Sequence, residues 1–286
     1  MQVGVVFPQT EIGGDVGAVR AYGEAAAELG YRHVVAYDHV LGADPAVHIG
    51  WRGPYTITSS FHEPMVLFGF LAACTDLELV SGVVIGPQRQ TALLAKQAAE
   101  VDLLCRGRLR LGLGLGWNRV EYDALGKDFT TRGRRLEEQV ALLRKLWTEE
   151  SVTFTTSEET VLGAGLCPMP VQRPIPIWLG AGAPVALRRA GRIADGWFPI
   201  VPPDQRLVDA RALVDEAARA AGRDPATIPF EGRVSWSDGG STLEYRLSQW
   251  RAVDPPFLAI NTMGAGLTGA DAHIAAIAQA AEIWRA

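Results

Sequence analysis

The sequence predicts a (β/α)8 barrel, the TIM-barrel class of α/β folds, built as a single domain over residues 1–286. Short apolar runs alternate with amphipathic helical segments along the chain, which is typical of a parallel sheet covered by helices. Eight such strand–helix pairs can be traced, and the length fits eight pairs and one insertion. A doubly wound open sheet is the alternative, but it needs fewer strands.

The first four strand–helix pairs occupy the chain up to residue 147. The expected strands are Val3–Phe7, His33–Ala36, Glu78–Val84 and Leu109–Leu113. The expected helices are Asp15–Leu29, Pro64–Cys74, Thr91–Leu104 and Arg132–Trp147. Asp15 is a favourable N-cap, Pro64 suits the first turn of a helix, and Gly30 is a typical residue after a helix end. A long loop of residues 38–63 follows the second strand.

Residues 151–174 interrupt this alternation, and we expect them to form an insertion. Val152–Thr155 and Val161–Leu162 could pair as a small hairpin before a proline-rich stretch. The alternation then resumes. The remaining strands are expected at Ile177–Leu179, Gly196–Ile200, Ile228–Val234 and Phe257–Asn261. The remaining helices are expected at Val185–Ala194, Asp204–Ala221, Leu243–Val253 and Ala270–Trp284.

Composition disfavours several classes of function. The formal net charge of −5 argues against a nucleic-acid binder. Cys74, Cys105 and Cys167 are widely separated, so neither a disulfide framework nor a metal site is expected. The sequence has no apolar stretch long enough for a membrane span and no basic, apolar leader, so we expect a cytoplasmic protein. Only three of the 27 basic residues are lysine, a bias typical of GC-rich genomes.

Polar residues and glycines follow the predicted strands, where a barrel of this class carries its active site. Asp38 and His39 follow the second strand. Histidine can exchange a proton near neutral pH, and a neighbouring carboxylate can orient it. A structural hydrogen bond is the alternative role for His39. Trp51, Tyr55 and Phe61 give the long loop an apolar surface, which could line a substrate pocket or pack the loop down.

Glycine-rich turns follow four other strands. The run Gly180-Ala181-Gly182-Ala183 precedes a predicted helix, and the free N–H groups at a helix start suit a phosphate. A simple tight turn is the alternative. Gly264, Gly266 and Gly269 have the spacing of a dinucleotide fingerprint. The second strand and acidic residue that a Rossmann site needs do not follow them, so we reject that site.

Several segments together resemble the luciferase-like flavin and deazaflavin oxidoreductases, most closely the subgroup that depends on coenzyme F420, a deazaflavin. The resemblance is carried by Asp102–Gly126, Arg132–Trp147, Pro174–Pro199 and the shorter motifs Tyr37–His39, His62–Pro64 and Asn261–Leu267. It implies a barrel with an insertion and a flat cofactor ring at the carboxyl ends of the strands.

The resemblance also implies roles for individual residues. Gly82 and Val83 would be joined by a non-prolyl cis peptide bond that supports the ring, with Ile85 beside it. Asp38 and His39 would form the catalytic pair. Trp117 and Asn118 would lie near the ring edge or the cofactor tail. Gly180, Ala181, Gly182 and Ala183 would bind its phosphate. Some deazaflavin dehydrogenases use a glutamate as an acid near the position of Asn118, whereas this chain has Trp117 there and Glu121 one helical turn later.

We therefore expect an F420-dependent oxidoreductase that moves a hydride between the deazaflavin and a small organic substrate. An FMN-dependent monooxygenase, supplied with reduced flavin by a partner reductase, is the alternative. A cofactor-binding protein without turnover is a second one. The resemblance implies a homodimer. A sugar phosphate is disfavoured as substrate, because Lys96, Lys127 and Lys145 all lie on or near the helices after the third and fourth strands.

Overall fold

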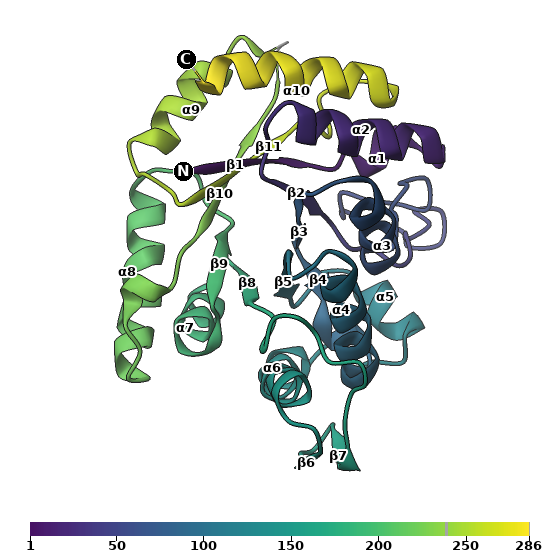
Figure 1. Cartoon of the computed structure of the whole chain (residues 1–286), viewed down its shortest axis with the longest axis vertical. Helices are drawn as coiled ribbons and strands as arrows, with labels where there is room; N and C mark the ends of the chain where they lie inside the picture. Colours follow the sequence, from purple (N-terminus) through teal and green to yellow (C-terminus); the bar gives the residue numbers. More distant parts are fainter. Residues whose placement is uncertain (238–239, 286) are drawn as a thin grey trace.

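Eight parallel strands form a nearly closed barrel, which confirms the predicted fold class (Figure 1). The computed structural model describes residues 1–237 and 240–285. The strand order is β10-β11-β1-β2-β3-β5-β8-β9. Their bounds are β1 Gln2–Val6, β2 His33–Ala36, β3 Glu78–Ser81, β5 Leu109–Gly114, β8 Ile177–Ala181, β9 Gly196–Pro199, β10 Glu231–Ser235 and β11 Phe257–Asn261. The N–H of Trp197 in β9 donates to Pro229 O at 3.0 Å, which brings β9 to the segment before β10.

One helix follows each of these eight strands, and each lies within two residues of its predicted bounds. They are α2 Val16–Glu28, α3 Pro64–Cys74, α4 Thr91–Leu104, α6 Arg132–Thr148, α7 Pro184–Ile193, α8 Gln205–Ala220, α9 Leu243–Arg251 and α10 Gly269–Arg285. Asp15 caps α2 as predicted, since its carboxylate accepts the N–H of Gly17 at 2.9 Å. Two short helices, α1 (Gln9–Ile12) and α5 (Arg119–Ala124), were not predicted.

The third predicted strand, Glu78–Val84, is interrupted, so its prediction as one continuous strand was wrong. β3 ends at Ser81, and a separate short strand β4 (Val84–Ile85) pairs with β5. A cis peptide bond joins Gly82 to Val83 between them. The hydroxyl of Ser81 donates to Gly112 O at 2.9 Å and accepts the N–H of Gly112 at 2.8 Å. A serine side chain thus continues the contact with β5 where the backbone ladder stops.

The seventh strand also differs from its prediction of Ile228–Val234, because β10 begins only at Glu231. The preceding residues form the 3-10 turn η2 (Pro225–Thr227). Pro225 and Pro229 have no N–H group to donate to a ladder, which accounts for the late start. Ile228 is buried in the core although it lies before the strand, so its apolar side chain indicates burial and not strand pairing.

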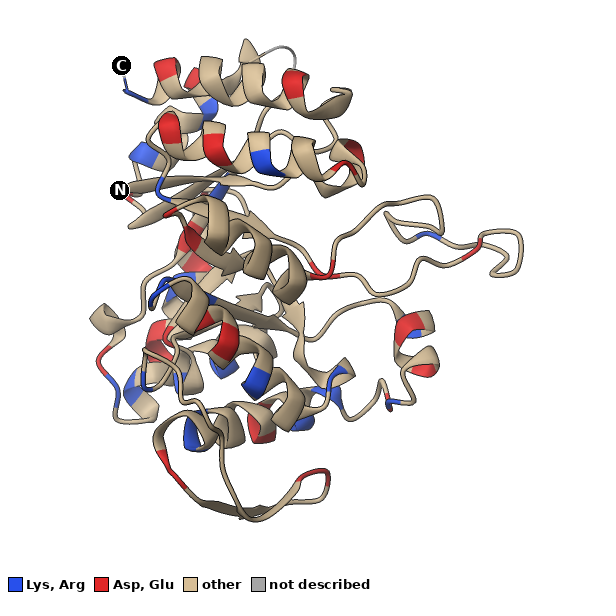
Figure 2. Ribbon diagram, turned by 45° about the vertical axis from the view of Figure 1, so that its right-hand side comes forward, with Lys and Arg blue, Asp and Glu red and all other residues tan. Residues whose placement is uncertain are grey.

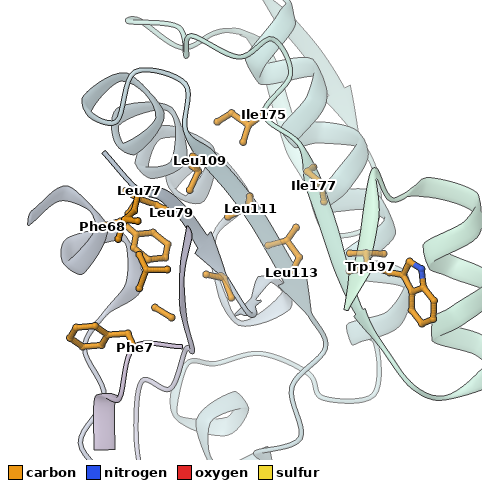
Figure 3. Packing of buried hydrophobic residues seen from close by; sticks show 14 of the residues in the cluster. Phe7, Phe68, Leu77, Leu79, Leu109, Leu111, Leu113, Ile175, Ile177 and Trp197 are labelled. Atoms are coloured by element: carbon orange, nitrogen blue, oxygen red, sulfur yellow. The ribbon is translucent and has the colours of Figure 1, made fainter. Parts of the chain in front are cut away.

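The side chains of the strands divide between two apolar regions and one charged layer. Leu109, Leu111 and Leu113 of β5 belong to the main core between barrel and helices (Figure 3). A small separate cluster inside the barrel is formed by Val6, Val35, Val80 and Ala259. Arg110, which alternates with the core leucines, contacts Glu231 at 2.6 Å and Glu78 at 2.8 Å. The barrel interior therefore has a charged layer at the strand starts and an apolar layer above it.

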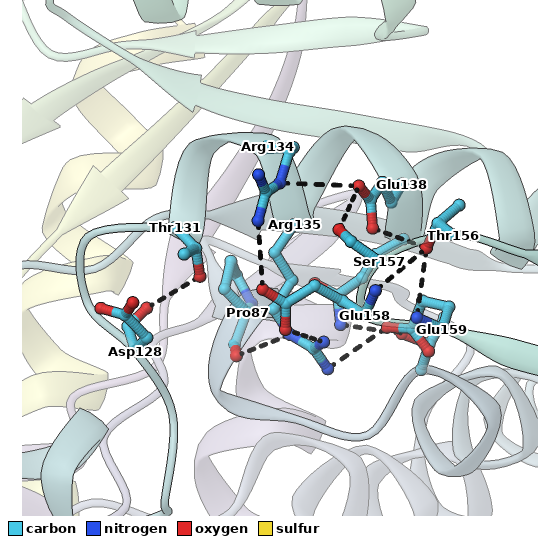
Figure 4. Close-up of polar contacts among 12 residues, drawn as sticks. Pro87, Asp128, Thr131, Arg134, Arg135, Glu138, Thr156, Ser157, Glu158 and Glu159 are labelled. Atoms are coloured by element: carbon cyan, nitrogen blue, oxygen red, sulfur yellow. Dashed lines mark hydrogen bonds and ion pairs between the residues drawn. The ribbon is translucent and has the colours of Figure 1, made fainter.

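The predicted hairpin in the insertion is confirmed as β6 (Val152–Thr155) paired with β7 (Thr160–Ala164). Ion pairs hold its turn against α6 (Figure 4). Arg135 contacts Glu158 at 3.3 Å and Glu159 at 3.2 Å, and Thr156 donates to Glu138 at 2.7 Å. The insertion is thus fastened to the barrel next to the segment that follows β4.

Acidic and basic residues are interspersed along the outer helices (Figure 2). Within residues 1–237 and 240–285, no helix is long and apolar enough to cross a membrane. The same residues contain no group of histidine, cysteine and acidic side chains that could hold a metal ion.

Candidate functional site

A pocket of about 420 Å³ opens at the carboxyl ends of the barrel strands. Its walls come from the segments after β2, β3, β5, β8 and β9, and from β10. Its lining includes nine of the predicted site residues, namely Asp38, His39, Gly82, Val83, Ile85, Trp117, Gly180, Gly182 and Ala183. Asn118 and Ala181 do not line it. The fold therefore brings together most of the residues that the sequence singled out, from four separate segments.

Val83 occupies the pocket because two glycines, Gly114 and Gly180, leave room for it. The predicted cis bond between Gly82 and Val83 is confirmed. A Cβ atom on Gly114 would collide with the Val83 side chain, and one on Gly180 would lie 3.3 Å from it. A Cβ on Gly82 would in turn meet Val35 at 2.5 Å. Such a closely packed glycine cradle around one apolar side chain fits a flat aromatic ring laid against it.

Asp38 is buried and holds the segment that follows the cis bond. One carboxylate oxygen accepts the N–H of Ile85 at 3.0 Å, and the other accepts from Arg89 Nη2 at 2.9 Å. Arg89 also contacts Glu63 at 2.8 Å. Burial lowers the pKa of Arg89, but the two carboxylates outweigh it and raise the pKa above its ordinary value. The geometry gives Asp38 a positioning role, and a direct catalytic role for it stays a prediction.

His39 is oriented by Glu121, which is fully buried behind it. The distance between His39 Nδ1 and Glu121 Oε1 is 3.1 Å. The same oxygen accepts the N–H groups of Val40 at 3.0 Å and Leu41 at 3.2 Å, and Glu121 Oε2 accepts from Gln88 Nε2 at 3.2 Å. Burial raises the pKa of Glu121, but His39 and these donors lower it below its ordinary value overall. Glu121 is therefore ionised at neutral pH.

This pairing fixes the tautomer of His39. An ionised carboxylate can only accept hydrogen bonds, so we assign the proton to Nδ1 of the imidazole. The other ring nitrogen, Nε2, is then free to accept or donate a proton at the reacting atoms. His39 is packed between Tyr55 and Phe61, with both ring centroids 4.8 Å away, and Trp117 at 5.4 Å. Tyr55 lines the pocket, whereas Trp51 packs against Trp117 at 5.7 Å.

The turn after β8 opens directly into α7. Gly182 and Ala183 lie between the strand and the helix, and Pro184 is the first helical residue. The positive end of the helix dipole and the backbone N–H groups of the turn face a site that suits a phosphate. A Cβ on Gly182 would lie 3.2 Å from Ile200, which closes the other side of this turn. The Ala181 side chain is buried, so it could contribute only its backbone.

Comparison with known proteins identifies the family. The model of the luciferase-like monooxygenase family matches residues 1–261. The chain belongs to this family of oxidoreductases. It is 28% identical over 237 residues to the F420-dependent glucose-6-phosphate dehydrogenase of Microbacterium testaceum, a match that covers 80% of this chain and 67% of that protein. The chain spans 61% of one Mycobacterium tuberculosis protein that it matches and 45% of a Mycobacterium tuberculosis ketoreductase.

Solved structures with a similar fold include both monooxygenases and a deazaflavin dehydrogenase. The monooxygenase RslO1 from Streptomyces bottropensis has a TM-score of 0.79 and 21% identity, covering 99% of this chain and 98% of its own. An F420-dependent secondary alcohol dehydrogenase in complex with an F420–acetone adduct has a TM-score of 0.71 and 20% identity, covering 87% and 74%. The oxygenating constituent of 3,6-diketocamphane monooxygenase from Pseudomonas putida, in complex with FMN, has a TM-score of 0.65 and 16% identity, covering 87% and 71%. At these identities the likeness concerns the luciferase-like fold alone.

One predicted residue of the luciferase-like site, Asn118, has another task in the structure. Asn118 caps α5, because its Oδ1 accepts the N–H of Val120 at 3.1 Å while its Nδ2 donates to Leu41 O at 3.2 Å. It thereby places Glu121 and the loop after His39. The spacing of Asn118 and Glu121 is that of a capping box. The capping-box pattern is the feature of the sequence that could have drawn attention to Glu121. It predicts that the Glu121 side chain accepts the backbone N–H of residue 118, whereas in the structure this side chain contacts His39.

Sequence reasoning also missed Tyr37 and Arg233. Both line the pocket, and Arg233 Nη1 donates to the Tyr37 hydroxyl at 2.8 Å. Burial raises the pKa of Tyr37, opposed by the Arg233 charge, so the phenol keeps its proton at neutral pH. Arg233 lies two residues after Glu231 on the same strand, so the two side chains share the inward face of the barrel. This alternation could have identified Arg233 from the sequence. The late start of β10 obscured that alternation in the sequence.

Proposed function

We propose that this member of the luciferase-like family is an F420-dependent oxidoreductase that transfers a hydride between the deazaflavin and a carbonyl or alcohol substrate. The observation that carries the proposal is the pairing of His39 with Glu121 at the pocket. It leaves one imidazole nitrogen free beside the Val83 cradle. The names of the Microbacterium relative and of the alcohol dehydrogenase with a similar fold support the same chemistry.

The pocket residues would hold the cofactor in two places. The ring would lie against Val83 in the space left by Gly114 and Gly180, and the phosphate would bind at the turn of Gly182 and Ala183. When bound, the deazaflavin supplies the hydride donor or acceptor. The protein must then place the substrate carbon over the ring and exclude water, which is the contribution of the apolar side chains of Tyr55, Trp117 and the rest of the rim.

His39 Nε2 would hold or move the proton at the substrate oxygen. Reduction of a carbonyl to an alcohol needs one proton on oxygen, and oxidation of an alcohol removes it. Glu121 would stabilise the imidazolium that forms during oxidation, because its charge is fixed 3.1 Å from Nδ1. Asp38 would act indirectly by holding Ile85 and Arg89.

An FMN-dependent monooxygenase is the second candidate, favoured by the family description and by the FMN complex that shares the fold. It would use the same pocket and require a reductase partner. Titration of the purified chain with F420 and with FMN, followed by cofactor fluorescence, separates the two proposals. We expect micromolar binding of F420. Micromolar binding of FMN without binding of F420 would contradict the first proposal. Binding of a cofactor that no substrate reoxidises would indicate a cofactor-binding protein without turnover.

A further inference from the structure

Arg233 stands at the mouth of the barrel and, among the residues that the structure describes, has no acidic partner. Arg233 lies two residues after Glu231 on β10, one level above the charged layer. Its Nη1 donates to the Tyr37 hydroxyl at 2.8 Å, and its guanidinium lies 5.7 Å from the centroid of the Tyr37 ring. Tyr37 and His39 come from the same short segment after β2, so Arg233 faces the catalytic histidine's side of the pocket.

Arg233 also lines a second pocket of about 370 Å³ that adjoins the first. Ile200 and Arg233 are common to both pockets. The second pocket contains another arginine, Arg246 of α9, whose Nη1 donates to Ser235 O at 3.0 Å. The segment after β9, β10 and α9 thus line this second pocket, and both arginines border it next to the pocket that holds Val83.

The charge on these two arginines is not neutralised locally. Counting residues 1–237 and 240–285, no carboxylate forms an ion pair with either Arg233 or Arg246. Two less exposed arginines of the same barrel are paired with carboxylates, since Arg110 contacts Glu78 and Glu231, and Arg89 contacts Asp38 and Glu63. A guanidinium that keeps free N–H donors at a pocket wall is suited to bind a carboxylate or phosphate in two-pronged fashion.

We propose that Arg233 and Arg246 form a subsite for an anionic group, carboxylate or phosphate, carried by the substrate at the end remote from the reacting carbon. This inference rests on the proposed function and adds the class of substrate. The proposed place of the cofactor phosphate is the start of α7, and Ile200 borders both that turn and the pocket that the two arginines line. The absence of a lysine cluster thus does not exclude an anionic substrate, because arginines supply the positive charge.

The binding test uses the purified chain without cofactor and needs no turnover. Succinate and inorganic phosphate are titrated by calorimetry at constant ionic strength, with chloride as the reference salt. We expect one of the two anions to bind and Arg233→Met to weaken it about tenfold to hundredfold, the range for a hydrogen bond to a charged group. Arg246→Met is expected to weaken it less, and Arg233→Lys less than Arg233→Met. Arg219→Met, an exposed arginine of α8, serves as the matched control.

Two results would overturn the subsite. One is that neither succinate nor phosphate binds the wild-type chain. The other is that binding is unchanged in Arg233→Met. A third measurement separates substrate from cofactor, namely titration of F420 into the same variants. If Arg233→Met weakens F420 as much as it weakens succinate or phosphate, the arginine holds the cofactor and the assignment to substrate is wrong.

A turnover test addresses the reacting complex. With reduced F420 as hydride donor, kcat/KM is compared for succinic semialdehyde against butanal. With oxidised F420 as hydride acceptor, it is compared for glucose 6-phosphate against glucose. We expect the charged member of at least one pair to be preferred tenfold or more, and Arg233→Met to reduce that ratio. No turnover with any compound would count against the proposed function, whereas the anion titration would still decide the subsite.

Discussion

At the scale of single residues, the site depends on which ring nitrogen of His39 already has a hydrogen-bond partner. Glu121 fixes the Nδ1 proton and leaves Nε2 for chemistry. Exchanging His39 for Gln removes the proton carrier while keeping a polar side chain of similar reach. Because a positioned acid or base contributes about 10²–10⁴-fold, we expect kcat to fall within that range. The affinity for F420 should change much less, and steady-state kinetics with a fluorescence titration will check both.

The Glu121→Gln variant tests the positioning role separately. Gln keeps the shape but loses the charge that would stabilise the imidazolium, so we expect kcat to fall while KM changes little. Exchanging Glu137 for Gln provides a control, since this carboxylate pairs with Arg189 and Arg192 on α7, away from the pocket. A similar loss of kcat in both variants would contradict a specific link between Glu121 and His39.

The pH dependence of stability follows from the same carboxylate. The pKa of Glu121 is lower in the folded chain than its ordinary value, so its contribution to stability is complete above the unfolded pKa, about 4.3. This contribution declines as the pH falls below about 4.3 and through the still lower folded pKa. We therefore expect the difference in unfolding free energy between wild type and Glu121→Gln to be largest near pH 7. Urea titrations at several pH values measure it, and a difference that grows toward pH 4 would refute the assignment.

At the scale of elements, the interrupted third strand depends on glycines of its neighbours. Adding a methyl group at Gly114 would push Val83 out of its place, since the two would collide. We expect Gly114→Ala to destabilise the chain by about 1–3 kcal/mol, as overpacking does, and to weaken cofactor binding. Gly14→Ala is the control, because a Cβ there meets no atom within 4 Å. Equal cofactor affinity in the two variants would show that Val83 does not support the ring.

The elements themselves were largely predictable, and their interruptions were not. Helix bounds came within two residues because caps, stops and apolar periodicity are local signals. The break after Ser81 depends on a pairing between its hydroxyl and Gly112, which lies 31 residues away. The cis bond at Gly82 was anticipated only through the family resemblance, and no periodicity of the sequence indicates it.

At the scale of the whole molecule, closure of the barrel buries a charged layer. Arg110 lies between Glu78 and Glu231, with its guanidinium 4.4 Å from the Trp178 ring centroid, and His33 completes the cluster at 3.0 Å from Glu231. Exchanging Arg110 for Met leaves two carboxylates without their cation. We expect a loss of about 3–5 kcal/mol in unfolding free energy, the usual effect of breaking a buried pair. Chemical denaturation measures it, with Arg219→Met as a near-neutral reference, and a loss below that of the reference would contradict the role of the layer.

The homodimer implied by the resemblance stays a prediction at this scale. Sedimentation equilibrium across a concentration series tests the assembly, and a mass near 30.8 kDa throughout would reject it.

The sequence by itself determined the barrel, its insertion and most of the pocket wall. These follow from alternation, capping and the rule that active residues succeed barrel strands, all of which act over short stretches of chain. Only the tertiary structure decided that Glu121 serves His39, that Asp38 serves Ile85 and Arg89, and that Arg233 reaches Tyr37. Those pairs are separated by 47 to 196 residues. The direction of a polar side chain is set by the partner that folding brings to it, and one sequence carries no record of that partner.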